Sequence, residues 1–187
     1  EGTYKETFTD INGNKSEIDF MHRLMDIEYY ENGDTKAVKL PYTNGLSMVV
    51  VLGDTKNILN DIHNNKMTSK LVDVSLPKFK AEYSIDYVNI LKNMGIEKAF
   101  DYQNADFSLM LENYPERIKI DSVLQKAMID VDEKGTEAAA ATVAVLTKSA
   151  LSVDEEVIEF KADKPFTYYI LDDSGNVYFA GRYVKAE

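Results

Sequence analysis

The stretch Val131-Asp132-Glu133-Lys134-Gly135-Thr136-Glu137-Ala138-Ala139-Ala140-Ala141-Thr142-Val143-Ala144-Val145 is the most informative part of this chain. Residues 121–131 carry apolar side chains near every second position, a pattern typical of a strand with one buried face. If a strand continued past Gly135, one of its faces would be small and uncharged, since it would begin with Thr136, Ala138, Ala140 and Thr142. A segment that enters an existing sheet needs such a face, because bulky or charged side chains would clash or have to be desolvated.

Taken alone, the same residues are compatible with other structures. Alanine is the best helix former, so residues 137–145 could also form a short helix or a polar surface loop. In a continued strand, the single acid Glu137 would lie on the outer face. The stretch by itself leaves these alternatives open.

Motifs on both sides of the stretch resemble those of serpins. Residues 76–87, followed by 88–100, are similar to a serpin strand, the helix after it and a phenylalanine-containing segment. Residues 160–182 are similar to the closing signature and final hairpin of the family, and residues 4–8, 20–21, 40–42 and 48–52 are similar to the middle of a serpin. The motifs occur in family order, so the chain resembles an inhibitory serpin with a bacterial-type hinge over essentially its whole length.

The resemblance implies an α+β serpin fold of mostly antiparallel β-sheets with a few helices. It makes residues 1–187 the C-terminal portion of a single serpin domain, with a reactive-centre loop at 136–156. A serpin is roughly twice as long as this chain, near the upper size of a single core. We therefore expect either a separate N-terminal piece that completes the fold or a self-associated fragment.

Local patterns predict individual elements. The predicted elements are strands at 26–30, 35–40 and 48–52, and helices that begin at Asp54 or Thr55 and at Ser84 or Asp86. Asn32-Gly33 supplies the positive backbone angles of a tight hairpin turn between the first two strands. Gly95 is expected to end the second helix.

Composition excludes several classes of partner. The chain has 21 Lys and Arg against 32 Asp and Glu, a net charge of −11, and its basic residues are scattered. This balance argues against nucleic acid and anionic membranes as partners. The apolar run 46–52 is far shorter than the ~20 residues of a membrane-spanning helix and predicts a buried strand.

Cysteine is absent, which excludes disulfides but leaves the compartment open. Residues 1–4 do not read as a signal peptide. The serpin resemblance favours an extracellular location, with the cytoplasm as the alternative.

The sequence gives little support to an enzyme. His22 and His63 are its only histidines, and no Gly-x-Ser-x-Gly motif accompanies either. Asp130 and Asp132 would point away from Glu133 on a strand, which makes a poor calcium loop. We expect no catalytic residues, no metal and no cofactor.

The inhibitory mechanism implied by the resemblance makes the loop a substrate of a serine protease. Counting from Gly135 at the usual family spacing places the scissile bond at Ser149-Ala150, with Lys148 and Ala150 as other candidates for the specificity residue. Ser149 or Ala150 would suit an elastase-like or subtilisin-like protease with a shallow pocket, whereas Lys148 would suit a trypsin-like one. We favour the small-pocket protease.

The resemblance also assigns structural roles. The hinge comprises Glu133, Gly135, Thr136, Glu137, Ala138, Ala139, Ala140, Ala141 and Thr142. Lys78 and Glu133 match an ion pair at the top of the sheet, although both could instead be solvated surface charges. The competing functions are a non-inhibitory serpin that serves as a carrier, chaperone or storage protein, and an inactive, self-associating serpin fragment.

Overall fold

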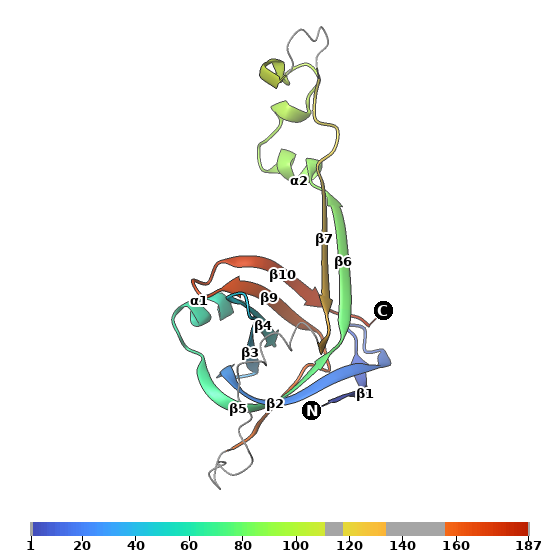
Figure 1. The fold of residues 1–187 in the computed structure, drawn as a ribbon. Helices are drawn as coiled ribbons and strands as arrows, with labels where there is room; N and C mark the ends of the chain where they lie inside the picture. The colour runs from blue at the N-terminus through green and yellow to red at the C-terminus, as the bar shows by residue number, and fades with distance from the viewer. Residues whose placement is uncertain (1, 111–117, 134–155, 187) are drawn as a thin grey trace. The chain divides into compact units, whose positions relative to one another are not determined.

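A computed structural model describes residues 2–110, 118–133 and 156–186 of the chain (Figure 1). These residues form mostly strands, with a few short helices, which confirms the predicted α+β class. They fall into two compact units, residues 1–79 with 130–187 and residues 80–129, and each is described by itself.

The first unit is built around one large sheet. Its strands are β1 (Gly2–Thr9), β2 (Lys15–Asn32), β3 (Thr35–Pro41), β4 (Leu46–Leu52), β5 (Thr68–Pro77), β8 (Ile158–Lys161), β9 (Phe166–Asp172) and β10 (Val177–Tyr183). Their order is β10-β9-β4-β3-β2-β5-β8, and β1 pairs separately with β2. Neighbouring strands are antiparallel, except that β8 runs parallel to β5.

Strand β2 connects the parts of this sheet. Its first half pairs with β1, its middle with β5 and its last residues with β3. The hairpin turn falls where it was predicted, since Asn32 pairs with Thr35 and Gly33 has a φ of 59°. The strand begins at Lys15, well before the predicted start at Asp26. Its early residues do not alternate regularly between apolar and polar, so the pattern alone did not reveal them.

The predicted buried strand at 46–52 is β4, which lies in the interior of the sheet. Val49, Val50 and Val51 are all fully buried, as expected when both faces of a strand are covered. Val49 and Val51 pack with Ile58 and Leu171 in one hydrophobic cluster. This cluster joins β4, β9 and the helix that follows β4.

An aromatic cluster fills another part of the core. Phe79, Phe166, Tyr168 and Tyr183 lie with ring centroids about 5 to 6 Å apart. Gly181 makes room for it, because a Cβ there would lie 2.2 Å from the Tyr168 hydroxyl oxygen. The Tyr168 ring of the neighbouring strand therefore occupies the space that a side chain at position 181 would need.

Helix α1 (Ile58–His63) begins later than predicted. Asn57 occupies its N-cap position and makes no side-chain capping bond. Asp54 instead accepts the backbone N–H of Lys56 at 2.9 Å, and the Thr55 carbonyl accepts that of Ile58. Both predicted caps were wrong, because these residues form the turn before the helix.

The second unit contains a two-stranded sheet and a short helix. Its elements are β6 (Phe79–Asp86), α2 (Val88–Asn93), 3-10 turns at Lys98–Phe100 and Ser108–Met110, and β7 (Leu124–Val131). Asp86 accepts the backbone N–H of Val88 at 3.0 Å and that of Val123 at 3.1 Å. Tyr87 occupies the N-cap position of α2 and makes no side-chain capping bond, so Asp86 forms the turn before the helix, and Gly95 follows the helix with a φ of 93°.

Candidate functional site

Glu133 lies shortly after β7, separated from its end by Asp132, and immediately before residues 134–155. Its carboxylate is held from two sides. Lys78 Nζ lies 2.7 Å from Oε2, and the Thr3 hydroxyl donates to Oε1 at 2.7 Å. The structure thus brings together the two residues that the serpin resemblance paired.

These contacts join three segments that are distant in sequence. Lys78 connects β5 to β6, and its backbone N–H donates to the Asp19 carbonyl at 2.8 Å. Thr3 lies in β1, where it pairs with Met21 of β2. Glu133 is therefore anchored to the loop after β5 and to the edge strand β1. Sequence reasoning missed Thr3, because a threonine in a strand carries no signal of a partner 130 residues away.

The contacts favour the charged forms of both partners. Hydrogen bonds from Lys78 and Thr3 lower the pKa of Glu133 to about 2. The same carboxylate raises the pKa of Lys78. Both side chains remain partly exposed, so water screens the pair. The arrangement positions the chain before residue 134.

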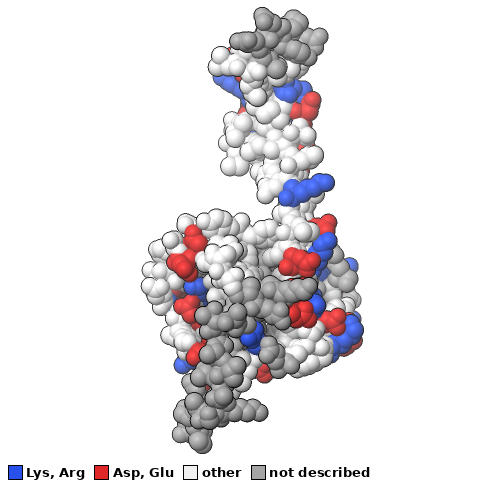
Figure 2. All heavy atoms as spheres, in the orientation of Figure 1, with Lys and Arg blue, Asp and Glu red and all other residues white. Residues whose placement is uncertain are grey.

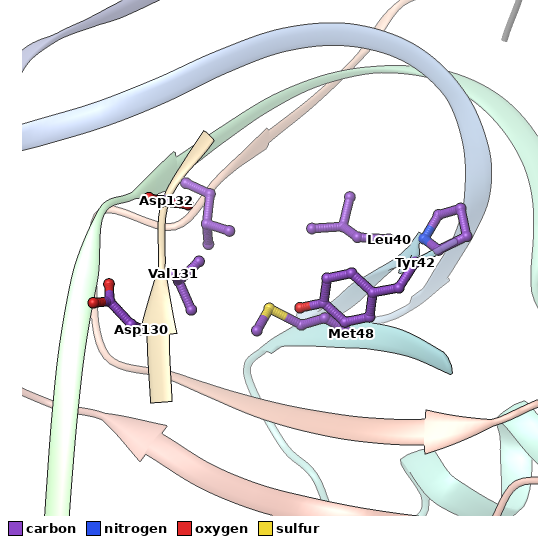
Figure 3. Close-up of a pocket in the computed structure, with 8 residues that line it drawn as sticks. Leu40, Tyr42, Met48, Asp130, Val131 and Asp132 are labelled. Atoms are coloured by element: carbon purple, nitrogen blue, oxygen red, sulfur yellow. The ribbon is translucent and has the colours of Figure 1, made fainter. Parts of the chain in front are cut away.

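A small pocket lies beside this anchor (Figure 3). It is lined by Leu40, Pro41, Tyr42, Met48, Leu76, Asp130, Val131 and Asp132 and has a volume of about 20 Å³. That volume holds a single water molecule, whereas small-molecule sites measure about 300 Å³ or more. The pocket marks the place where residues 130–132 of the first unit meet β3 and β4.

Two larger hollows flank α1. One, of about 180 Å³, is lined by Tyr30, Asp61 and other polar residues, and the second, of about 230 Å³, includes His63. Asp61 is buried but satisfied, since it accepts the Tyr30 hydroxyl at 2.5 Å and pairs with Lys66 at 2.7 Å. These contacts lower the pKa of Asp61.

The two histidines have different surroundings. His63 is exposed, as its sequence context predicted. His22 stacks on Tyr4, and its Nε2 lies 3.2 Å from Glu6 Oε1. Ser75 is opposite His22 in the sheet, but its hydroxyl has no hydrogen-bond partner among the described residues. Ser75 is therefore not activated as a nucleophile by His22.

The other predicted site residues lie outside the described residues. They are Gly135, Thr136, Glu137, Ala138, Ala139, Ala140, Ala141 and Thr142 of the hinge, and Lys148, Ser149 and Ala150 at the scissile bond. Lys78 and Glu133 are the predicted site residues that the structure places.

Charge is mixed on the surface. Figure 2 shows basic and acidic side chains interspersed on one face of the first unit. No helix among the described residues is long and apolar enough to cross a bilayer.

The chain matches the family model described as serpin (serine protease inhibitor) over residues 1–186. It is 36% identical to a serpin-like protein of Thermococcus kodakarensis, over 96% of this chain and 44% of that protein. It is 35% identical to serine proteinase inhibitor 2 of cowpox virus, over 81% of this chain and 46% of the viral protein.

Solved structures show the same relationship. Native tengpin, a thermophilic serpin, matches with a TM-score of 0.77 and 29% identity, over 98% of this chain and 50% of tengpin. Native protease nexin-1 with heparin matches with a TM-score of 0.77 and 26% identity, over 98% of this chain and 52% of that protein. The fold is that of a serpin-class protein. The chain belongs to the serpin family, and it spans about half the length of the relatives it matches.

Proposed function

We propose that the complete protein inhibits a serine protease as a suicide substrate, with residues 136–156 as its reactive-centre loop. The observation that carries the proposal is the hinge sequence in a chain that belongs to the serpin family. Its alternate positions Thr136, Ala138, Ala140 and Thr142 are small and uncharged. Such a face can enter a sheet without clash or desolvation of charge.

The proposed reaction begins as ordinary proteolysis. The protease serine attacks the carbonyl carbon of Ser149, the bond to the Ala150 nitrogen breaks, and an acyl-enzyme ester forms. The new Ala150 amine takes the proton that the protease base removed from the serine. The loop then inserts into the large sheet before water can hydrolyse the ester. Each added backbone hydrogen bond contributes about 1 kcal/mol net, and apolar burial adds to this.

The target follows from the specificity residue. Ser149 is small, so we propose an elastase-like or subtilisin-like protease with a shallow pocket. Lys148 would instead direct the loop to a trypsin-like protease. Family membership and the viral relative named as a proteinase inhibitor support a serine protease as the partner in general.

We also propose that residues 1–187 are the C-terminal portion of a single serpin domain. The support is that the chain spans 44% of its archaeal relative and 50% of tengpin. An N-terminal portion would then complete the fold, either in the same chain or as a separate piece. An extracellular location is proposed on the family resemblance, with the cytoplasm as the alternative.

The test mixes the complete protein with pancreatic elastase, subtilisin and trypsin in separate reactions. Denaturing gels report a covalent complex, and sequencing of the released peptide reports the bond that was cut. We expect a denaturant-resistant complex and a new N-terminus at Ala150. A new N-terminus at Ser149 would instead identify Lys148 as the specificity residue and favour trypsin-like targets.

A matched pair of hinge variants separates inhibition from simple cleavage. Ala138→Arg puts a charge on the inward face and should convert the inhibitor into a substrate, with at least about tenfold less complex and more cleaved product. Ala139→Arg, on the outward face, should retain the complex. Cleavage of the unmodified protein without any complex would favour the second candidate, a non-inhibitory serpin that is a carrier, chaperone or storage protein.

A further inference from the structure

Strand β8 is held in the sheet by few ladder hydrogen bonds, although the chain re-enters the sheet there after residues 134–155. It is four residues long and follows residues 134–155 in sequence. It lies at the end of the strand order, so β5 is its only sheet neighbour among the described strands. Edge strands this short are readily displaced unless something beyond the ladder holds them.

Two backbone bonds link the segment after β8 to the sheet. The Ala162 N–H donates to the Ser75 carbonyl at 2.9 Å. The Thr9 N–H donates to the Asp163 carbonyl at 2.8 Å, which connects the end of β1 to the segment after β8. Because β1 also pairs with β2, and β2 with β5, these links close a ring of β1, β2, β5 and β8.

A polar cluster spans this ring. His22, Ser75 and Lys161 are register partners in one row across β2, β5 and β8. Glu6 of β1 completes the cluster. Its Oε2 lies 2.5 Å from Lys161 Nζ and its Oε1 lies 3.2 Å from His22 Nε2. The ring of Tyr4 stacks on His22 with centroids 3.9 Å apart.

The cluster differs from ordinary surface ion pairs by its burial. The side chains of Glu6 and His22 are 18% and 13% exposed. In the same hairpin, the ion pair of Lys5 and Asp19 is 65% and 50% exposed. Glu6 also raises the pKa of Lys161, as expected for a close partner that favours its charged form.

Burial makes the cluster sensitive to loss of one member. Glu6 Oε2, His22 Nε2 and Ser75 Oγ are buried atoms that accept or donate no hydrogen bond of good geometry among the described residues. The lysine ammonium is the nearby charge that offsets the buried carboxylate. Removing it leaves a largely desolvated negative charge, which is far more costly than losing an exposed pair.

We propose that Glu6, His22 and Lys161 form a polar clamp that fastens β8 to the β1–β2 hairpin. The clamp fixes the point at which the chain re-enters the sheet after residues 134–155. Lys161 adds a side-chain link between β8 and β1 to the backbone bond that joins Thr9 to Asp163. If the proposed function is correct, the clamp holds the C-terminal end of the reactive-centre loop, and this last step rests on that function.

The test is amide hydrogen exchange of the complete protein carrying Lys161→Met. Methionine keeps the length and apolar stem of lysine but removes the charge. We expect exchange in the peptide covering 158–163 to rise at least about fivefold, while the β3 and β4 amides keep their protection. The matched control is Lys5→Met, which removes an exposed lysine from the same hairpin and should leave β8 exchange unchanged.

Glu6→Gln provides a second variant of nearly equal shape. It leaves Lys161, whose side chain is 36% exposed and can reach water, so its effect on β8 should be smaller than that of Lys161→Met. Unchanged β8 exchange in both variants, or an equal loss of protection in every strand, would overturn the clamp. Exchange requires no protease, so failure to inhibit would count against the proposed function without affecting this result.

Discussion

At the residue scale, the anchor at Glu133 depends on ionisation. Its carboxylate is held by a cation and a hydroxyl, and these lower its pKa from an ordinary 4.5 to about 2. A group whose pKa is lower in the folded state stabilises the fold above its ordinary pKa. That contribution is lost as the pH falls through the folded value. The anchor should therefore weaken only in acid.

The first prediction concerns Glu133→Gln. The variant should unfold at lower urea concentration than the unmodified protein at neutral pH, and the difference should shrink between about pH 4.5 and pH 2, where the native carboxylate also becomes neutral. Urea titrations followed by far-UV circular dichroism at several pH values measure it. Thr3→Val, which removes one of the two partners, should give an intermediate effect. A difference that does not depend on pH would mean that the charge of Glu133 is unimportant.

The second prediction concerns Gly181, where the structure leaves no room for a side chain. A Cβ there would meet the hydroxyl of Tyr168, which is itself buried in the aromatic cluster. Gly181→Ala should therefore destabilise the protein by about 1–3 kcal/mol through overpacking. Gly2→Ala is the matched control, because no atom lies within 4 Å of its added Cβ. Urea denaturation that finds the two variants equally stable would contradict this packing.

Single residues also show where sequence reasoning ends. Lys78 and Glu133 were paired through the serpin resemblance, and the structure places them 2.7 Å apart. Thr3, Glu6 and Lys161 were not singled out, because their contacts depend on how β1 and β8 are brought together. A charged residue on a strand looks the same in sequence whether it faces water or a buried partner.

At the element scale, local chemistry predicted the strands better than the helix starts. Buried runs such as β4 and the hairpin at Asn32-Gly33 carry strong signals, since burial and turn geometry are local demands. The start of α1 was wrong because Asp54 and Thr55 can satisfy either a turn or a helix N-terminus. The length of β2 was also missed, because half of that strand is polar and is held by long-range pairing.

The third prediction tests the turn that precedes α2. Sequence left Ser84 and Asp86 as alternatives, and the structure gives the backbone hydrogen bonds to Asp86. Asp86→Ala should raise hydrogen exchange of the first α2 amides about fivefold, because the Val88 N–H loses its acceptor. Ser84→Ala, two residues away, should leave α2 exchange unchanged. The reverse result would assign the start of the helix to Ser84.

At the scale of the whole molecule, the most informative feature of the sequence was the order of its motifs along the chain. Motifs spread from residue 4 to residue 182 predicted a serpin because they follow one another as in that family, and the family model covers residues 1–186. The comparison with relatives also shows what share of their length this chain matches. The chain spans about half of its relatives, so surfaces that are covered in a complete serpin need not be covered here.

The second unit exposes apolar side chains on a small sheet. Its two-stranded sheet of β6 and β7 is the kind of element that is only marginally stable alone in water. On β7, the side chains of Leu124 and Met128 are 66% and 60% exposed. Clustered exposed apolar side chains and unpaired strand edges both promote association between chains.

The fourth prediction is that the isolated 187-residue chain self-associates, whereas the complete protein remains monomeric. Sedimentation velocity over about a hundredfold range of concentration measures this, since association of exposed strands depends on concentration. Leu124→Lys with Met128→Lys in the isolated chain should shift it toward monomer by adding charge to the exposed face. Lys126→Glu is a matched control on the same strand, because it exchanges one charged side chain for another and leaves the apolar side chains in place. An isolated chain that stays monomeric would show that the β6–β7 sheet needs no covering, and would weaken the proposal that an N-terminal portion completes the fold.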